Sequence, residues 1–201
     1  MTTLANTEVR AIEAEIETLK KRLSEARRRA TPELVTDLAL VARNGAPTSL
    51  SKLFGGRRDL LAVHNMGRRC VYCTLWADGF TGLWPHIDDR TAFVLVSEDE
   101  PAVLDEFARS RGWTFPVASM HGTDFATALG VAYEGTHQQP GVSAFHRRDD
   151  GSIVRTGYAS FGPGDDFCAV WPMFDLLAGG ASEWSPKFKY GCCGSSCCCG
   201  H

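Results

Sequence analysis

The chain has 201 residues, a formal net charge of −3 at pH 7 and a hydrophobic fraction of 44%. This length fits one domain with an extension, and the apolar fraction is that of an ordinary globular protein. The slightly acidic balance argues against nucleic acid as a general partner. The sequence has no run of roughly eighteen apolar residues and no basic-then-apolar leader, so we expect no membrane span and a cytoplasmic protein.

Apolar residues recur at alternating spacings of three and four near the N-terminus, which predicts a helical arm within residues 1–30. One apolar seam runs along it: Val9, Ile12, Ile16, Leu19, Leu23 and Ala26. The seam spans about two and a half heptads, which is less than a coiled-coil prediction requires. We expect it to pack against the domain, with a homodimer through this helix as the alternative.

Residues 31–184 predict one α/β domain, because buried strands alternate with helices before a hairpin and a last helix. The segment 34–41 reads as a strand or a short helix, and 49–54 as one or two helical turns. The predicted strands are 60–63, 93–96, 115–117, 142–145 and 153–158. The predicted helices are 74–80, a helix starting at 99–101 and ending at Gly112, 123–130, and 167–177.

The pair Cys70-x-x-Cys73 follows the predicted strand 60–63 and precedes a predicted helix. Two cysteines at this spacing and in this context are typical of a thioredoxin-like dithiol. The helix N-terminus, with Arg68 and Arg69, favours a thiolate and lowers the thiol pKa below its usual value of ~8.5. We expect Cys70 to attack a disulfide and Cys73 to resolve the mixed disulfide.

Other residues are predicted to support the dithiol. Arg69, Trp76 and Asp78 shape its surroundings, and Pro140 lines the substrate groove. Thioredoxin-like folds carry a cis proline facing the dithiol at the place of Pro140, although an ordinary trans proline also suits a turn before a strand. Cys168 lies in an apolar helical pattern and is expected to be a buried, inert thiol.

Four other interpretations of the cysteine pair remain open, and the simplest is that both cysteines are small buried residues. A lone C-x-x-C can be half of a zinc site, but no second half occurs between Thr74 and Tyr190. His64 and Met66 could join the two cysteines as Cu(I) ligands, although both are more often packing residues. A peroxidase is less favoured, because residues 65–69 lack the proline and threonine that precede a peroxidatic cysteine.

The C-terminal segment 185–201 is rich in cysteine, and such Cys/His tracts are typical of metal binding. Thiolates select soft ions, so we expect Cu(I) first and Zn(II) second. A disordered tail and a relay for the dithiol are the alternatives. The predicted ligands are Cys192, Cys193, Cys197, Cys198, Cys199 and His201.

Four stretches, 49–57, 70–78, 112–116 and 158–162, resemble a bacterial family of thioredoxin-like proteins called DUF899. The C-x-x-C-x-x-W-A-D string of 70–78 is the specific part. The resemblance covers nearly everything up to Leu177. It implies a thioredoxin-like mixed sheet flanked by helices, with Cys70 and Cys73 as the redox pair, and it implies no substrate. The short loop between His64 and Cys70 and the cysteine-rich tail depart from the family pattern.

Taken together, these patterns predict a cytoplasmic thiol-disulfide oxidoreductase with a tail that binds a soft metal. Its partner would be a protein or small-molecule disulfide, and no organic cofactor is indicated. The alternative is a Cu(I)-binding or copper-handling protein on the same scaffold, without disulfide turnover.

Overall fold

The structure is a computed structural model that describes residues 7–132 and 137–191. These residues form one eight-stranded mixed sheet in the order β1-β8-β7-β4-β5-β6-β2-β3. The strands are β1 (Glu33–Val35), β2 (Ala39–Ala42), β3 (Pro47–Ser49), β4 (Asp59–Asn65), β5 (Ala92–Ser97), β6 (Val117–Ser119), β7 (Gly141–Arg147) and β8 (Ile153–Ser160). The helices are α1 (Thr7–Arg29), α2 (Leu50–Leu53), α3 (Val71–Arg90), α4 (Pro101–Arg111), α5 (Phe125–Ala128) and α6 (Val170–Phe174).

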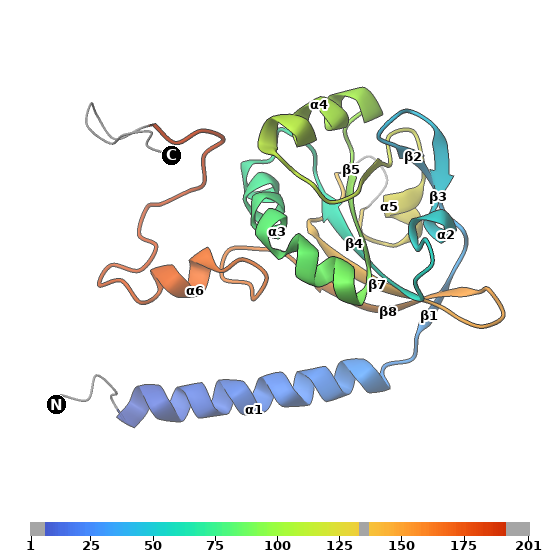
Figure 1. The fold of residues 1–201 in the computed structure, drawn as a ribbon. Coiled ribbons are helices and arrows are strands. Elements are labelled where there is room, and N and C mark those ends of the chain that lie inside the picture. The colour runs from blue at the N-terminus through green and yellow to red at the C-terminus, as the bar shows by residue number, and fades with distance from the viewer. Residues whose placement is uncertain (1–6, 133–136, 192–201) are drawn as a thin grey trace.

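The centre of the sheet is apolar on both faces. Leu60 and Ala62 of β4 pack on one side, whereas Val63 and Phe93 pack on the other, because successive side chains of a strand alternate between faces. The first face is covered by α2 and α5, and the second by α3 and α4 (Figure 1). Strands β4, β5 and β6 run parallel, so their carboxyl ends meet at one edge of the sheet.

Most predicted elements of the domain occur in the structure. The hairpin β7–β8 turns at 148–152, and α4 begins at Pro101 and ends before Gly112. The ambiguous segment 34–41 overlaps the end of β1 and most of β2, so it is extended and not helical. Three helices differ in length from the prediction. Helix α5 is confined to Phe125–Ala128 of the expected 123–130. Helix α3 runs ten residues beyond Phe80, to Arg90, because its apolar face stays on the sheet. The last helix is confined to Val170–Phe174.

The shortening of the last helix has a local cause. The carboxylate of Asp165 accepts hydrogen bonds from the backbone N–H groups of Phe167 (2.7 Å) and Cys168 (3.1 Å), which holds this segment in a turn. Beyond α6, Leu176 is 86% exposed, so no packing face stabilises further helical turns.

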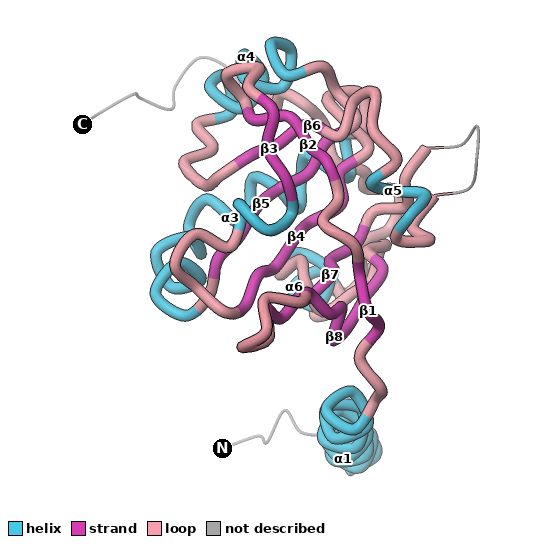
Figure 2. The backbone as a smooth tube through the Cα atoms, turned by 90° about the vertical axis from the view of Figure 1, so that its right-hand side faces the viewer, coloured by secondary structure: helices cyan, strands magenta, loops and turns pink. Residues whose placement is uncertain are grey.

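Helix α1 stands apart from the domain (Figure 2). None of its residues is buried, so the expected packing of the seam against the domain does not occur. The domain meets one flank of α1, where Lys20 pairs with Asp166 at 2.6 Å. In the part of the chain that is described, no helix is long and apolar enough to cross a bilayer.

Candidate active site

The loop that presents Cys70 is fixed by the ends of β4 and β5. Asn65 accepts a hydrogen bond from the backbone N–H of Gly67 (2.8 Å), and Asp99 accepts one from the N–H of Arg68 (2.6 Å). Gly67 has a φ of +93°, and a Cβ there would lie 2.9 Å from the carboxylate of Asp99. Only glycine therefore suits this turn, which delivers Cys70 to the start of α3.

Cys70 is the N-cap of α3, as the sequence predicts. Its Sγ accepts a hydrogen bond from the backbone N–H of Cys73 at 3.1 Å. Its carbonyl accepts hydrogen bonds from the N–H (3.1 Å) and the hydroxyl (3.0 Å) of Thr74. Cys70 is half-buried, whereas Cys73 is only 3% exposed. The outer sulfur is thus accessible, and the inner one lies a single turn behind it.

The two thiols differ sharply in acidity. The hydrogen bond from the thiol of Cys73, with backbone N–H groups of the helix end, lowers the pKa of Cys70 to about 6 despite partial burial. The same hydrogen bond, followed by burial, strongly raises the pKa of Cys73. At neutral pH Cys70 is therefore a thiolate and Cys73 the thiol that donates to it.

Reduced protein should be alkylated fastest at Cys70, with a rate that is half-maximal near pH 6. Below that pH the sulfur is protonated and loses nucleophilicity, and above it the rate reaches a plateau. Cys73 and Cys168 should react slowly at neutral pH, because burial helps to raise both of their pKa values. Limiting iodoacetamide followed by mass spectrometry measures this, with denatured protein, expected to titrate near ~8.5, as the control. Faster labelling of Cys73 or Cys168 would contradict the assignment.

A cavity of about 610 Å³ opens beside Cys70. It offers the half-buried sulfur of Cys70 together with aromatic, cationic and acidic groups, and its volume is within the usual range of small-ligand sites. Its lining consists of Met66, Arg69, Cys70, Val71, Tyr72, Glu98, Asp99 and His137. Of the residues predicted as support, Arg69 alone lies on this lining.

The segment that carries His137 and Gln138 forms one wall of the cavity and is hydrogen-bonded to the ends of β4 and β5. Glu98 accepts a hydrogen bond from the backbone N–H of Gln138 and lies 2.6 Å from Nδ1 of His137. Gln138 is fully buried, and its Nε2 donates to the carbonyls of Asn65 (2.6 Å) and Val96 (3.0 Å). Buried amide groups that join two strand ends hold the segment rigidly, because each unmade hydrogen bond is costly. His137 is thereby held at the cavity.

Trp76, Asp78 and Pro140 have other surroundings. Trp76 is buried and stacks on Phe161 with ring centroids 5.5 Å apart. Asp78 accepts hydrogen bonds from the guanidinium of Arg111 and from the indole N–H of Trp113, which joins α3 to the end of α4. The Gln139–Pro140 peptide bond is trans, and the carbonyl of Pro140 accepts from the N–H of Phe161 at 2.9 Å.

The residues considered as Cu(I) ligands are spread between the core and the cavity. His64 is buried, its Nε2 lies 2.8 Å from the hydroxyl of Ser143, and burial lowers its pKa to about 4. Met66 lines the cavity instead. The described residues contain no group of three or more His, Cys, Asp or Glu side chains placed to hold a metal ion. The tail ligands Cys192, Cys193, Cys197, Cys198, Cys199 and His201 lie outside the described residues.

Sequence reasoning missed Glu98, His137 and Gln138 as parts of the site. Glu98 directly follows a strand predicted next to the cysteine strand, and parallel neighbours bring their carboxyl ends together. That signal could have found Glu98 and Asp99. No local pattern marks His137 or Gln138. They lie about forty residues further along the chain than Glu98 and Val96, the residues that they contact.

A family model described as a bacterial protein of unknown function, DUF899, matches residues 4–193. The chain belongs to the DUF899 family. The resemblance found in the four sequence stretches is thus confirmed at the level of the family. No curated protein matches the chain.

Solved structures share the architecture of this DUF899 protein at low identity. The peroxidoxin BcpB of Mycobacterium tuberculosis is 22% identical with a TM-score of 0.50, covering 65% of this chain and 84% of that one. A peroxiredoxin-like protein of Aquifex aeolicus is 12% identical with a TM-score of 0.51, covering 64% and 74%. An uncharacterized conserved protein of Geobacillus kaustophilus is 17% identical with a TM-score of 0.51, covering 68% and 74%. These likenesses confirm the predicted thioredoxin-like fold class, in the form that peroxiredoxins share.

Proposed function

We propose that this DUF899 protein is a thiol-disulfide oxidoreductase that reduces a protein or small-molecule disulfide with Cys70 and Cys73. The observation that carries the proposal is the hydrogen-bonded pair itself: an accessible sulfur with a pKa of about 6 at a cavity mouth, backed by a buried thiol one turn away. A reaction that uses one cysteine alone does not require a second thiol one helical turn away, whereas disulfide exchange uses it to resolve the mixed disulfide.

The reaction has two exchange steps. The thiolate of Cys70 attacks one sulfur of the substrate disulfide, forms a mixed disulfide and releases the other half as a thiolate. Cys73 then loses its proton to the released thiolate or to water, and its sulfur attacks Sγ of Cys70. The second half of the substrate leaves as a thiolate. The substrate gains two electrons, and the protein is left with a Cys70–Cys73 disulfide.

The first step also activates Cys73 for the second. The largest cause of its raised pKa is the hydrogen bond to Cys70, to which the negative charge of Cys70 adds. Once Cys70 is in a mixed disulfide, that charge is gone and burial remains as the opposing cause. The pKa of Cys73 therefore falls when its nucleophilicity is required.

The test compares substrates in one assay. Reduced protein, turned over with dithiothreitol, should reduce insulin or oxidised glutathione faster than it reduces hydrogen peroxide, measured as initial rates under equal substrate concentrations. A rate with peroxide that exceeds both disulfide rates by roughly tenfold or more would overturn the proposal in favour of a peroxidase.

The cysteine-rich tail supports a second proposal, that residues 192–201 bind Cu(I) or, more weakly, Zn(II). Five thiols with glycine and serine between them can supply the two to four sulfur ligands that these ions take. Titration of the reduced protein with Cu(I) against a competing chelator should give a tight site that is lost when residues 191–201 are deleted. Unchanged stoichiometry and affinity after deletion would exclude the tail as the site. Replacement of Cys70 and Cys73 by serine is the control, because it should leave this site intact.

A further inference from the structure

We propose that the apolar seam of α1 is an interface for a second copy of this chain, paired antiparallel. The seam comprises Val9, Ile12, Ile16, Leu19, Leu23 and Ala26. Its five large side chains, Val9 to Leu23, are each between 46% and 50% exposed, although they lie in one line on a 23-residue helix. An isolated helix of this kind gains little from propensity alone, since most helical stability comes from burying such a face.

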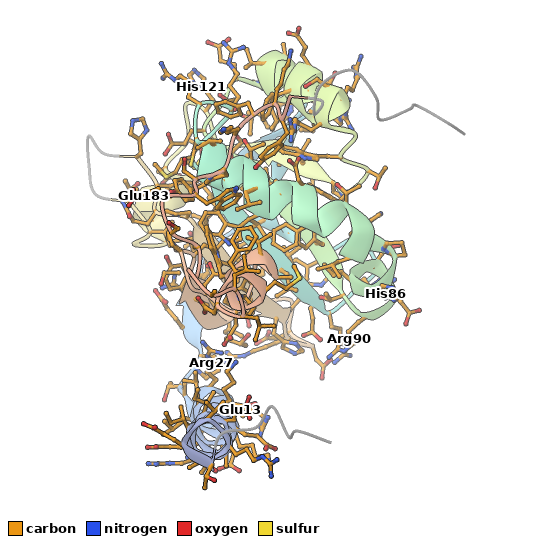
Figure 3. All side chains as sticks on the ribbon, turned by 90° about the vertical axis from the view of Figure 1, so that its left-hand side faces the viewer. Glu13, Arg27, His86, Arg90, His121 and Glu183 are labelled. Atoms are coloured by element: carbon orange, nitrogen blue, oxygen red, sulfur yellow. The ribbon has the colours of Figure 1, made fainter. Side chains whose placement is uncertain are left out.

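The domain leaves this seam free. Contacts from the domain reach one flank of α1, where Lys20 pairs with Asp166 and Arg27 lines a small cavity beside Tyr158. Figure 3 looks nearly along α1 and shows Arg27 on the side facing the domain, with the helix otherwise standing clear. The seam and the opposite flank, which carries Glu15 and Arg22, are therefore open to another helix.

A second copy fits the seam in an antiparallel arrangement. With Val9 at heptad position a, the seam residues alternate between a and d, and an antiparallel pair stacks each a against a d of the other copy. Ile16 then packs on Leu19 of the second copy, Ile12 on Leu23, and Val9 on Ala26. Each large residue meets another apolar residue along the whole helix.

The charges favour the same orientation. Residues 7–18 of α1 carry four glutamates and one arginine, whereas residues 19–29 carry six basic residues and one glutamate. Antiparallel pairing therefore places the acidic half of each helix beside the basic half of the other. At the flanking g positions, on the flank that the domain leaves open, it brings Glu15 next to Arg22 of the second copy.

A parallel pair is disfavoured by the same positions. There each g residue meets the e residue five places later in the other copy, and two of the three such pairs join like charges, Glu8 with Glu13 and Arg22 with Arg27. Like charges at these positions destabilise the pair. Acidic residues near the N-terminus and basic residues near the C-terminus also stabilise a single helix through its dipole. The distribution of charge along α1 is therefore not evidence of pairing by itself. The orientation is specified by which charged residues meet at the e and g positions.

Sedimentation equilibrium of the full, reduced chain tests the interface. Wild-type protein should be a monomer–dimer equilibrium, and Ile16→Glu or Leu19→Glu should raise the dimer dissociation constant at least roughly tenfold. Ala14→Glu is the matched control, because it adds the same charge to the helix face opposite the seam and should leave the constant unchanged. A wild-type chain that stays monomeric at about 200 µM, or seam variants that dimerise like wild type, would overturn the interface.

Charge exchange tests the orientation. Glu15→Arg and Arg22→Glu should each weaken the dimer by about two- to fivefold, and the double variant should restore it. In a parallel pair Arg22→Glu would instead strengthen the dimer, because the introduced carboxylate would meet Arg27 of the second copy. That result would overturn the antiparallel arrangement. Circular dichroism of each variant confirms that α1 remains helical.

Discussion

Replacement of Cys70 by serine should abolish disulfide reduction, lowering turnover by about a thousandfold or more. A serine hydroxyl at the N-cap stays protonated near neutral pH, so the nucleophile is lost while the cap hydrogen bond to Cys73 can be retained. The measurement is the initial rate of insulin or oxidised glutathione reduction by the full chain, with dithiothreitol as reductant.

Cys73→Ser should fail at a different step. Cys70 still attacks, but the resolving sulfur is absent, so the protein should accumulate a mixed disulfide. Its mass exceeds that of the reduced protein by one substrate thiol minus two hydrogen atoms. Mass spectrometry of the intact protein and of its peptides locates the adduct on Cys70. Cys168→Ser is the matched control, because Cys168 is buried in the apolar cluster that contains Trp76 and Phe161 and has a pKa raised mainly by burial. Full activity in Cys70→Ser, or loss in Cys168→Ser with an intact fold, would contradict the assignment.

Gly141→Ala should destabilise the domain by about 2–3 kcal/mol. Gly141 opens β7 between β4 and β8, where it pairs with His64 and Ser160. A Cβ at this position would lie 2.5 Å from the backbone carbonyl of Ala159 and 3.0 Å from the ring of Tyr158. A carbonyl in a paired strand moves only if the strand moves, so the central sheet must shift. Urea unfolding gives the change in free energy.

Gly157→Ala provides the matched control in the adjacent strand. A Cβ at Gly157 has no atom within 4 Å, and the backbone there lies outside the left-handed region. This variant should stay within about 0.5 kcal/mol of wild type or gain slightly from the lower entropy of its unfolded chain. Equal losses in the two variants would show that the loss of glycine, and not the close approach to Ala159, sets the cost.

The sequence by itself determined the features of this protein that depend on residues close together in the chain. The buried strands around Leu60 and Phe93 were predictable, because continuous apolar runs bounded by turn residues identify central strands. The N-cap position of Cys70 follows from a strand, a short turn and a helix in immediate succession. Helix α1 was predictable in the same way, because its apolar residues recur at spacings of three and four.

Only the tertiary structure decided how far these elements extend and which side chains they bring into contact. Helix α3 continues past Gly79 and Pro85 because Phe80 and its neighbours bury a face on the sheet, which outweighs poor local propensity. Glu98 and His137 share the cavity of Cys70 because parallel strands bring their carboxyl ends to one edge and Gln138 fastens the returning chain there. The sequence alone determined that the protein carries a dithiol on a thioredoxin-like strand and helix. Only packing across distant segments decided which groups face the dithiol, since side-chain proximity over such separations depends on the path of the chain and on no local periodicity.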